Sequence, residues 1–153
     1  MKLIKITSDV KKSQYNEVKN IYTDFFRNIN YDSLYTEDLI DTFARKKTLD
    51  VFNHDNLCKY FFAINENEII GFIHGKIVND IGLISHAYVK EEYRKQLIFA
   101  VLSKKLLSWF KQNNINLIEI EVNKNNTFAN NIEGKGWRIT RSFDDANIYQ
   151  RKI

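Results

Sequence analysis

The chain has 153 residues, a formal net charge of +4 and a hydrophobic fraction of 44%, which suit one globular domain, expected here over residues 1–153. The charge is small and the lysines are scattered, so the sequence does not indicate a nucleic-acid-binding protein. The apolar runs are too short to span a membrane. Residues 1–5 lack the apolar stretch of a signal peptide, and the single cysteine, Cys58, excludes an internal disulfide, so we expect a cytoplasmic protein.

The first half of the chain predicts one strand, two helices and a hairpin. Apolar residues recur at helical spacing between residues 15 and 29, which indicates an amphipathic helix. The turn residues Asn65, Glu66 and Asn67 separate two apolar runs, as is typical of a hairpin. In chain order, the expected elements are a strand at 3–7, helices at 13–30 and 37–51, and strands at 60–64 and 69–73.

The second half predicts a strand–helix–strand segment followed by a final pair of strands. Asn79 and Asp80 mark a turn before it, and apolar residues at helical spacing begin at Ile98. The expected elements are strands at 82–89, 117–122, 137–143 and 148–153, and helices at 98–110 and 129–135. Antiparallel hairpins combined with a strand–helix–strand crossover predict an α+β fold with a mixed sheet.

Several short motifs in the predicted order resemble the GNAT superfamily of acetyl-coenzyme A-dependent N-acetyltransferases. They are Ile69-Ile70-Gly71-Phe72, the run from Ala87 to Arg94, the spacing of Val122, Asn126 and Ala129, and the pair Gly136-Trp137. Each motif is weak alone, but their order and spacing together are fairly specific. The resemblance covers nearly the whole chain and implies a central, mostly antiparallel sheet flanked by helices on both faces.

The resemblance also implies where acetyl-CoA would bind. In the family the cofactor lies in a wedge between the fourth and fifth strands, here 82–89 and 117–122, and its pyrophosphate lies on backbone N–H groups at the start of the next helix. The cofactor residues implied in this way are Ala87, Tyr88 and Val89 on the strand, Arg94, Lys95, Gln96, Leu97, Ile98, Phe99 and Ala100 in the loop, and Asn126.

Two positions of this loop differ from the family pattern. Leu97 stands where the family has Gly, and Phe99 where it has Gly or Ala, residues that let phosphate approach the backbone. Leu97 fits if its backbone is helical, whereas the ring of Phe99 would project near the pyrophosphate. Alternatively, Leu97 and Phe99 join the apolar face of the helix, with Ile98 turned elsewhere. The loop is therefore either impaired or remodelled but working.

Two residues are candidates for the general base that the chemistry requires. Glu121 comes first, because some GNAT members, including bacterial ribosomal-protein alanine acetyltransferases, carry a functional Glu directly before the residue that corresponds to Val122. Strand alternation places Glu119 and Glu121 on one face, which could equally be a solvated polar face. His86 comes second, because an imidazole titrates near neutrality, although a buried structural histidine is the alternative.

The remaining catalytic roles are less well marked. By resemblance, the N–H group of Val89 would face the thioester carbonyl. In the family the acid is often a Tyr. The corresponding position in this sequence is Glu133 or, if residues are counted back from Gly136, Ile132. Neither of these residues is a Tyr. Tyr88 and Tyr93 lie nearby in the sequence, with packing as the alternative role.

The sequence therefore predicts an acetyl-CoA-dependent N-acetyltransferase that acts on a primary amine of a small molecule or a protein. The alternative is a GNAT-fold binding or regulatory module that has lost efficient catalysis. No metal is expected, because no His/Cys cluster has metal-ligand spacing. Neither nucleic acid nor a membrane is an expected partner, and a homodimer is one possible assembly.

Overall fold

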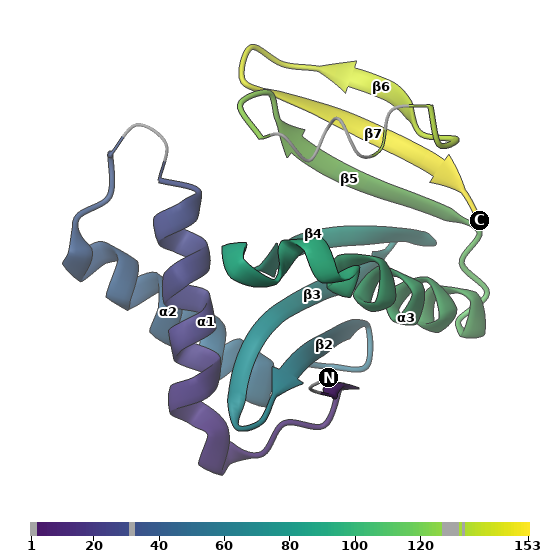
Figure 1. Ribbon diagram of the computed structural model, residues 1–153. Helices are drawn as coiled ribbons and strands as arrows, with labels where there is room; N and C mark the ends of the chain where they lie inside the picture. The colour runs from purple at the N-terminus through teal and green to yellow at the C-terminus, as the bar shows by residue number, and fades with distance from the viewer. Residues whose placement is uncertain (1–2, 31–32, 127–131, 133) are drawn as a thin grey trace.

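One twisted sheet with helices on both of its faces forms the protein (Figure 1). The computed structural model describes residues 3–30, 33–126, 132 and 134–153. Its elements in chain order are β1 (Ile4–Thr7), the 3-10 turn η1 (Lys12–Gln14), α1 (Tyr15–Asn28), α2 (Glu37–Phe52), β2 (Cys58–Asn65), β3 (Glu68–Val78), β4 (Ile81–Val89), η2 (Glu91–Gln96), α3 (Ile98–Gln112), β5 (Leu117–Asn123), β6 (Arg138–Ser142) and β7 (Ala146–Lys152).

The strands lie in the order β1-β2-β3-β4-β5-β7-β6. β4 and β5 are parallel, and the other neighbouring strands are antiparallel. Asn79 and Asp80, with φ angles of 51° and 64°, form the two-residue turn between β3 and β4, which suits the twist of a hairpin. The predicted α+β fold with a mixed, mostly antiparallel sheet is confirmed.

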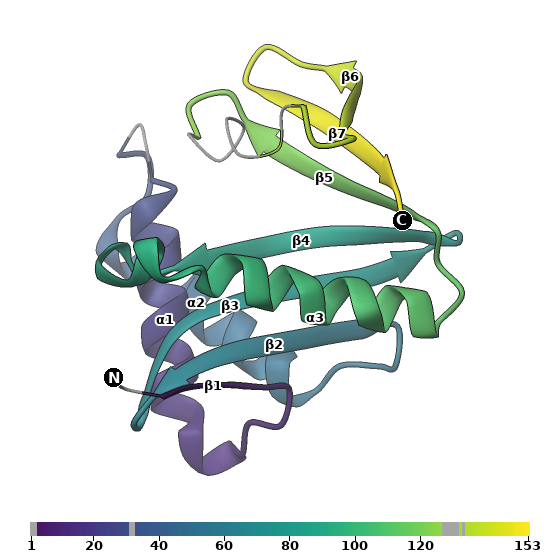
Figure 2. The ribbon, with the colours of Figure 1, turned by 45° about the vertical axis from the view of Figure 1, so that its right-hand side comes forward.

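The helices form because each carries an apolar face that the sheet covers. α1 and α2 lie on one face of the sheet and α3 lies on the other (Figure 2). Neighbouring residues of β3 show both layers, since Phe72 packs into the cluster around α1 and Ile73 into the cluster around α3. Thr36 caps α2 by accepting a hydrogen bond from the Leu39 N–H group at 3.2 Å, a common helix start.

The element boundaries differ from the prediction mainly at the two ends of the fold. A 3-10 turn, not the helix itself, occupies residues 12–14. β7 begins at Ala146, two residues before the predicted position, because the Phe143 N–H group donates to the Ala146 carbonyl at 2.8 Å and closes the turn there. The predicted helix at 129–135 lies largely outside the described residues. Within the described residues, no helix is both long and apolar enough to cross a membrane.

Candidate functional site

The sheet opens into a wedge between its two parallel strands. β4 and β5 pair only through Gly82–Ile84 and Ile118–Ile120, although β4 continues to Val89 and β5 to Asn123. Beyond these three residue pairs the strands separate, as both ribbon views show (Figures 1 and 2). The predicted separation of these strands is confirmed.

A β-bulge in β4 lies where the wedge begins. His86 pairs with His74 and Ile84 pairs with Gly75, so Ser85 between them is an extra residue without a partner in β3. A bulge bends its strand and increases the local twist. β4 therefore turns away from β5 directly after Ile84, and its backbone beyond that point faces the wedge.

The wedge side of β4 is held firmly by packing on both faces. Val89 is 5% exposed and packs with Ala87 in the cluster around α3. Tyr88 points to the opposite face and packs against the cluster around α1, with its ring centre 6.0 Å from that of Phe25. The backbone of Ala87, Tyr88 and Val89 is thus fixed in place, as a pre-formed binding edge requires.

Arg94 folds back onto the end of β4. Its Nε donates to the Val89 carbonyl at 2.8 Å, and its guanidinium carbon lies 5.5 Å from the centre of the Tyr88 ring. Such a cation–π contact adds to the hydrogen bond. Arg94 therefore fixes the turn that leads from β4 into the loop, while Lys95 and Gln96 are exposed.

Lys90 ties the same turn to two other elements, a role that the sequence analysis missed. Its Nζ lies 2.7 Å from Glu68 in β3 and 3.4 Å from Asp24 in α1, and its side chain is 19% exposed. Charged partners so far apart in the chain leave no local pattern in the sequence. Lys90 thus anchors the loop to both the sheet and the helical layer.

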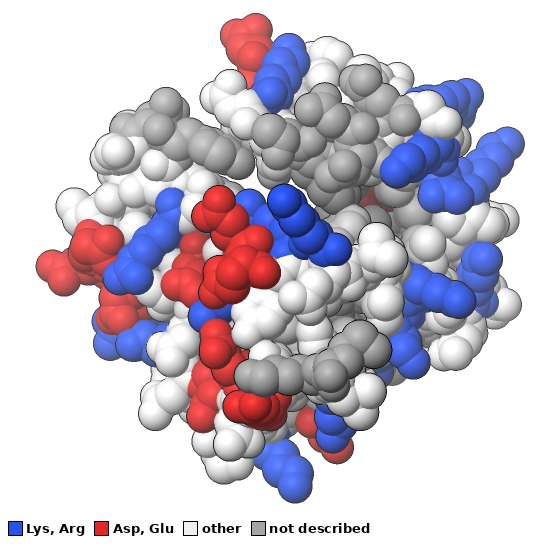
Figure 3. All heavy atoms as spheres, in the orientation of Figure 1, with Lys and Arg blue, Asp and Glu red and all other residues white. Residues whose placement is uncertain are grey.

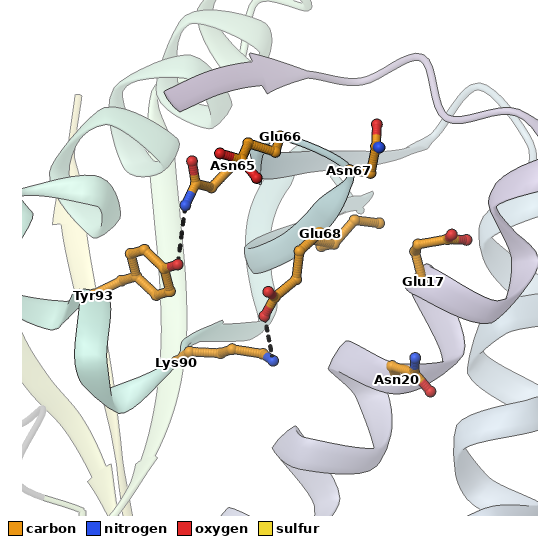
Figure 4. A pocket seen from close by; sticks show the side chains of 9 residues that line it. Glu17, Asn20, Asn65, Glu66, Asn67, Glu68, Lys90 and Tyr93 are labelled. Atoms are coloured by element: carbon orange, nitrogen blue, oxygen red, sulfur yellow. Dashed lines mark hydrogen bonds and ion pairs between the residues drawn. The ribbon is translucent and has the colours of Figure 1, made fainter. Parts of the chain in front are cut away.

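A cavity of about 480 Å³ lies beside Lys90 (Figure 4). It is lined by Glu17, Asn20, Asn65, Glu66, Asn67, Glu68, Ile69, Lys90 and Tyr93. The Tyr93 hydroxyl accepts from Asn65 Nδ2 at 3.0 Å. Its walls come from α1, from the β2–β3 hairpin and from the segment that follows β4, and none of its lining residues belongs to β5.

Leu97 does not have the helical backbone with which it would fit the family's loop. Its φ and ψ angles are 58° and 19°, which is the left-handed region, and its side chain is 74% exposed. The condition of a right-handed helical backbone is therefore not met at Leu97, which joins η2 to α3. The Gly that the family has at this position would adopt a positive φ without steric cost.

The first turn of α3 shows which of the loop residues pack into the core. Ile98 is 4% exposed and belongs to the core beneath α3, whereas Phe99 is only partly buried against that cluster. The alternative placed Leu97 and Phe99 on the apolar face of the helix and turned Ile98 elsewhere. It is wrong for Ile98, which is buried in the core, and for Leu97, which is exposed. The first backbone hydrogen bond of α3 runs from the Val101 N–H group to the Leu97 carbonyl. The N–H groups of Ile98 and of the exposed Ala100 therefore make no hydrogen bond within the helix.

Glu121 lies on β5 just past the point where the wedge opens. It is exposed, whereas Ile120 and Val122 on either side are buried in a cluster with Tyr149. The opposite face of β5, which carries Glu119 and Glu121, therefore points to the side of α1 and α2. Glu119 differs from Glu121 because its Oε1 accepts a hydrogen bond from Gln150 Nε2 at 2.9 Å.

His86 lies across the wedge from β5 on the same side of the sheet. Its ring centre is 5.2 Å from that of Phe25 and 6.1 Å from that of His74. Burial lowers the pKa of His86 to about 4, with a smaller effect from Lys47 and Lys76. Its surroundings disfavour the charged form, which supports the alternative of a buried structural histidine over a base that titrates near neutrality.

The structure describes three of the four positions considered for the acid. Ile132 is 5% exposed and part of the core around β5, and Glu133 lies outside the described residues. The pKa of Tyr88 is raised, mainly by burial. Asn126 is described, and its N–H group donates to the Asn123 carbonyl at 2.9 Å. Among the described residues, no group of three or more His, Cys, Asp or Glu is arranged to hold a metal ion.

The sequence of the chain matches one family model. The model describes the acetyltransferase (GNAT) family and matches residues 15–132, which include α1, the wedge strands and the loop before α3. No curated protein matches the chain by sequence.

Many solved structures share the fold. A PaiA N-acetyltransferase from Thermoplasma acidophilum, in complex with coenzyme A, has a TM-score of 0.79 at 19% identity over 99% of each chain. A GNAT-family acetyltransferase from Staphylococcus aureus has a TM-score of 0.74 at 19% identity, covering 98% of this chain and 99% of that one. The ribosomal-protein-S18-alanine N-acetyltransferase from Escherichia coli has a TM-score of 0.68 at 17% identity, covering 99% and 94%. At these identities the likeness establishes the fold.

Proposed function

The chain belongs to the GNAT acetyltransferase family, and we propose that it is an acetyl-CoA-dependent N-acetyltransferase acting on a primary amine of a small molecule or a protein. The observation that carries this proposal is the backbone edge of β4, which has no strand partner on the β5 side after Ile84. Such an edge offers N–H and C=O groups to an extended ligand, as a neighbouring strand would. The pantetheine arm of acetyl-CoA has amide groups of this kind.

The residues around the wedge fit the cofactor in most respects. Ala87, Tyr88 and Val89 would hold the pantetheine arm, and the start of α3 would hold the pyrophosphate, because a helix N-terminus favours anions. Lys95 is exposed beside it and adds positive charge. When bound, acetyl-CoA supplies the activated acetyl group. The PaiA structure in complex with coenzyme A supports this assignment as a relative of the same fold.

Leu97 is the feature that fits least well. Its exposed side chain stands at the loop, where it can keep phosphate oxygens from the backbone N–H groups. This observation favours a second candidate function, a GNAT-fold binding or regulatory module with little catalysis. The two functions differ in whether bound acetyl-CoA is consumed.

Glu121 is the residue that we propose as the general base. It is exposed at the open end of the wedge and, unlike Glu119, accepts no hydrogen bond from Gln150. In this position a carboxylate can take a proton from an ammonium group that approaches from the side of α1 and α2. His86, whose pKa is about 4, would instead remain neutral and line the wall opposite.

The rest of the assignment follows from the same placement. Val89 would present its N–H group to the thioester carbonyl, and Asn126 would lie near the cofactor beyond the end of β5.

We also propose that residues 1–153 form one acetyltransferase domain that works in the cytoplasm. All five residues of the edge strand β6 are exposed, so β6 is where a second copy could pair in a homodimer.

A combined binding and turnover experiment tests this function. Calorimetry with acetyl-CoA should show one site per chain, and release of free thiol should rise when a panel of primary amines is added. Binding without thiol release for any amine would favour the regulatory module. Absence of binding would remove both functions.

A further inference from the structure

A second pocket lies at the other end of the sheet from the loop before α3. It has a volume of about 340 Å³ and is lined by Leu117, Lys135, Gly136, Arg138, Gln150, Arg151 and Lys152. Leu117 begins β5, shortly after α3 ends at Gln112, whereas the cofactor loop precedes the start of α3. The 15 residues of α3 separate the two places by about 22 Å. This pocket is therefore distinct from the wedge.

The pocket collects positive charge without a matching negative charge. Four of its seven lining residues are Lys or Arg. In the described part of the chain, none of these four has a carboxylate within 4.0 Å. Lys and Arg side chains also predominate on the right-hand side of the space-filling view, over the sheet end where β7 finishes (Figure 3). The nearest acid across the strands, Glu119, already accepts a hydrogen bond from Gln150.

Arg151 and Gly136 shape one wall of this pocket. Arg151 is only partly exposed, and its side chain runs past Gly136, where a Cβ atom would lie 3.5 Å from the Arg151 Nε. Gly136 has a φ angle of 86°, which a residue with a side chain rarely adopts, so its backbone stays open beside the guanidinium. An unpaired guanidinium next to exposed backbone is suited to bind an oxyanion.

We propose that this pocket binds a small ligand that carries two or more phosphate groups. A compact diphosphate brings several negative charges into one cavity, which matches the four Lys and Arg side chains that line it. An acidic peptide in extended conformation presents a carboxylate on one face only about every 7 Å. Only one or two of its carboxylates would therefore enter the pocket. A nucleic-acid duplex is too wide to enter a cavity of about 340 Å³.

Inorganic pyrophosphate is the probe for this proposal, and amide chemical shifts of the ¹⁵N-labelled chain are the readout. Saturable shifts are expected for Gly136, Arg138 and the backbone of residues 150–152. Because both residues change an exposed charge, the variant Arg138→Glu/Lys152→Glu should fold normally, which its melting temperature checks. It should bind pyrophosphate about a hundredfold more weakly, because two charge-assisted contacts are lost and each loss weakens binding by about tenfold.

The matched control is Lys12→Glu/Lys46→Glu, which makes the same charge change at two exposed residues elsewhere. This control should bind pyrophosphate within about twofold of the unmodified chain, apart from the general effect of net charge. Shifts confined to residues 97–100, or equal weakening in both double variants, would overturn the proposal. So would a hexaglutamate peptide that shifts residues 136–138 and 150–152 at lower concentration than pyrophosphate. A failure here leaves the proposed acetyl transfer untouched, because that reaction uses the wedge.

Discussion

The two walls of the wedge are built differently. β4 is paired with β3 along its length and has a core cluster on each face, so Val89 is 5% exposed. β5 belongs to a three-stranded lobe with β7 and β6, which joins the rest of the sheet through three residue pairs. In that lobe, all five residues of β6 are exposed.

Because of this difference, the β4 wall and the β5 wall are suited to different tasks. The β4 wall offers backbone groups in a fixed geometry, and fixed geometry is what a common cofactor needs. The β5 wall carries exposed side chains, among them Glu121, and three residue pairs link it to β4. We therefore propose that cofactor recognition depends on the packed β4 wall, whereas acceptor recognition depends on the lobe and on α1 and α2. Each prediction below changes one wall and leaves the other intact.

Lowering the pH should have the largest effect, and it should act through His86 on β4 and its pairing partner His74 on β3. Burial is the main reason why the pKa of His74 falls to about 3 and that of His86 to about 4. Their ordinary pKa is about 6.5, so below that value the unfolded chain binds protons that the folded chain does not. The free energy of unfolding should therefore be highest above about pH 6.5 and fall towards pH 4, by up to about 1.4 kcal/mol per pH unit for each histidine.

Urea unfolding of the unmodified chain and of His74→Phe measures this slope. Phe can keep the stacked contact with Tyr60, whose ring centre is 4.1 Å away, but it cannot take a proton. Between pH 6.5 and pH 4.5 the variant should lose about half of the slope. An identical slope in both proteins would show that His74 does not couple folding to pH.

Replacing the proposed base should change activity and leave stability alone. Glu121→Gln removes a proton acceptor from the β5 wall, so turnover should fall by about 100-fold. Glu119→Gln is the matched control on the same strand face, and its new amide oxygen can still accept from Gln150 Nε2, now 2.9 Å from Glu119. We expect turnover of this control within about threefold of the unmodified protein. Equal losses in both variants, or no loss in Glu121→Gln, would remove Glu121 from the mechanism.

The smallest change concerns Leu97 at the end of the β4 wall. A left-handed backbone costs a residue with a side chain roughly 1–2 kcal/mol, and glycine loses about 0.5–1 kcal/mol through its freer unfolded state. Leu97→Gly should therefore stabilise the chain by about 0.5–1 kcal/mol, which raises the melting temperature by about 1–4 °C. Acetyl-CoA should also bind more tightly, because the exposed side chain is gone.

Phe99→Gly provides the contrast within the same loop. Phe99 is partly buried against the core around α3, so its loss should destabilise the chain by about 1 kcal/mol or more. Melting curves with and without acetyl-CoA separate stability from binding. If Leu97→Gly destabilised the chain as much as Phe99→Gly, the strain at position 97 would not be real.

Much of the fold was predictable because the signals are local. Helical spacing located α1 and α3, and the turn residues Asn79 and Asp80 located the hairpin of β3 and β4. The bulge at Ser85 was not predictable, since it depends on which residues of β3 pair with it. The position of the wedge came from the resemblance to the family.

The candidate site was predictable only in outline. The positive φ of Leu97 arises where η2 meets α3, and no local pattern around a leucine indicates it. The lowered pKa of His86 results from burial under α1, and the anchoring by Lys90 uses Asp24 and Glu68. The lowered pKa of His86 and the anchoring by Lys90 depend on contacts between residues far apart in the chain, which a single sequence does not reveal.

Hydrogen exchange with and without acetyl-CoA tests the central claim most directly. If the free edge of β4 pairs with the cofactor, amides within residues 85–89 and at the start of α3 should exchange more slowly in the complex. Amides of residues 82–84, which already face β5, should change little. Acetyl-CoA binding by calorimetry without added protection at residues 85–89 would contradict the account.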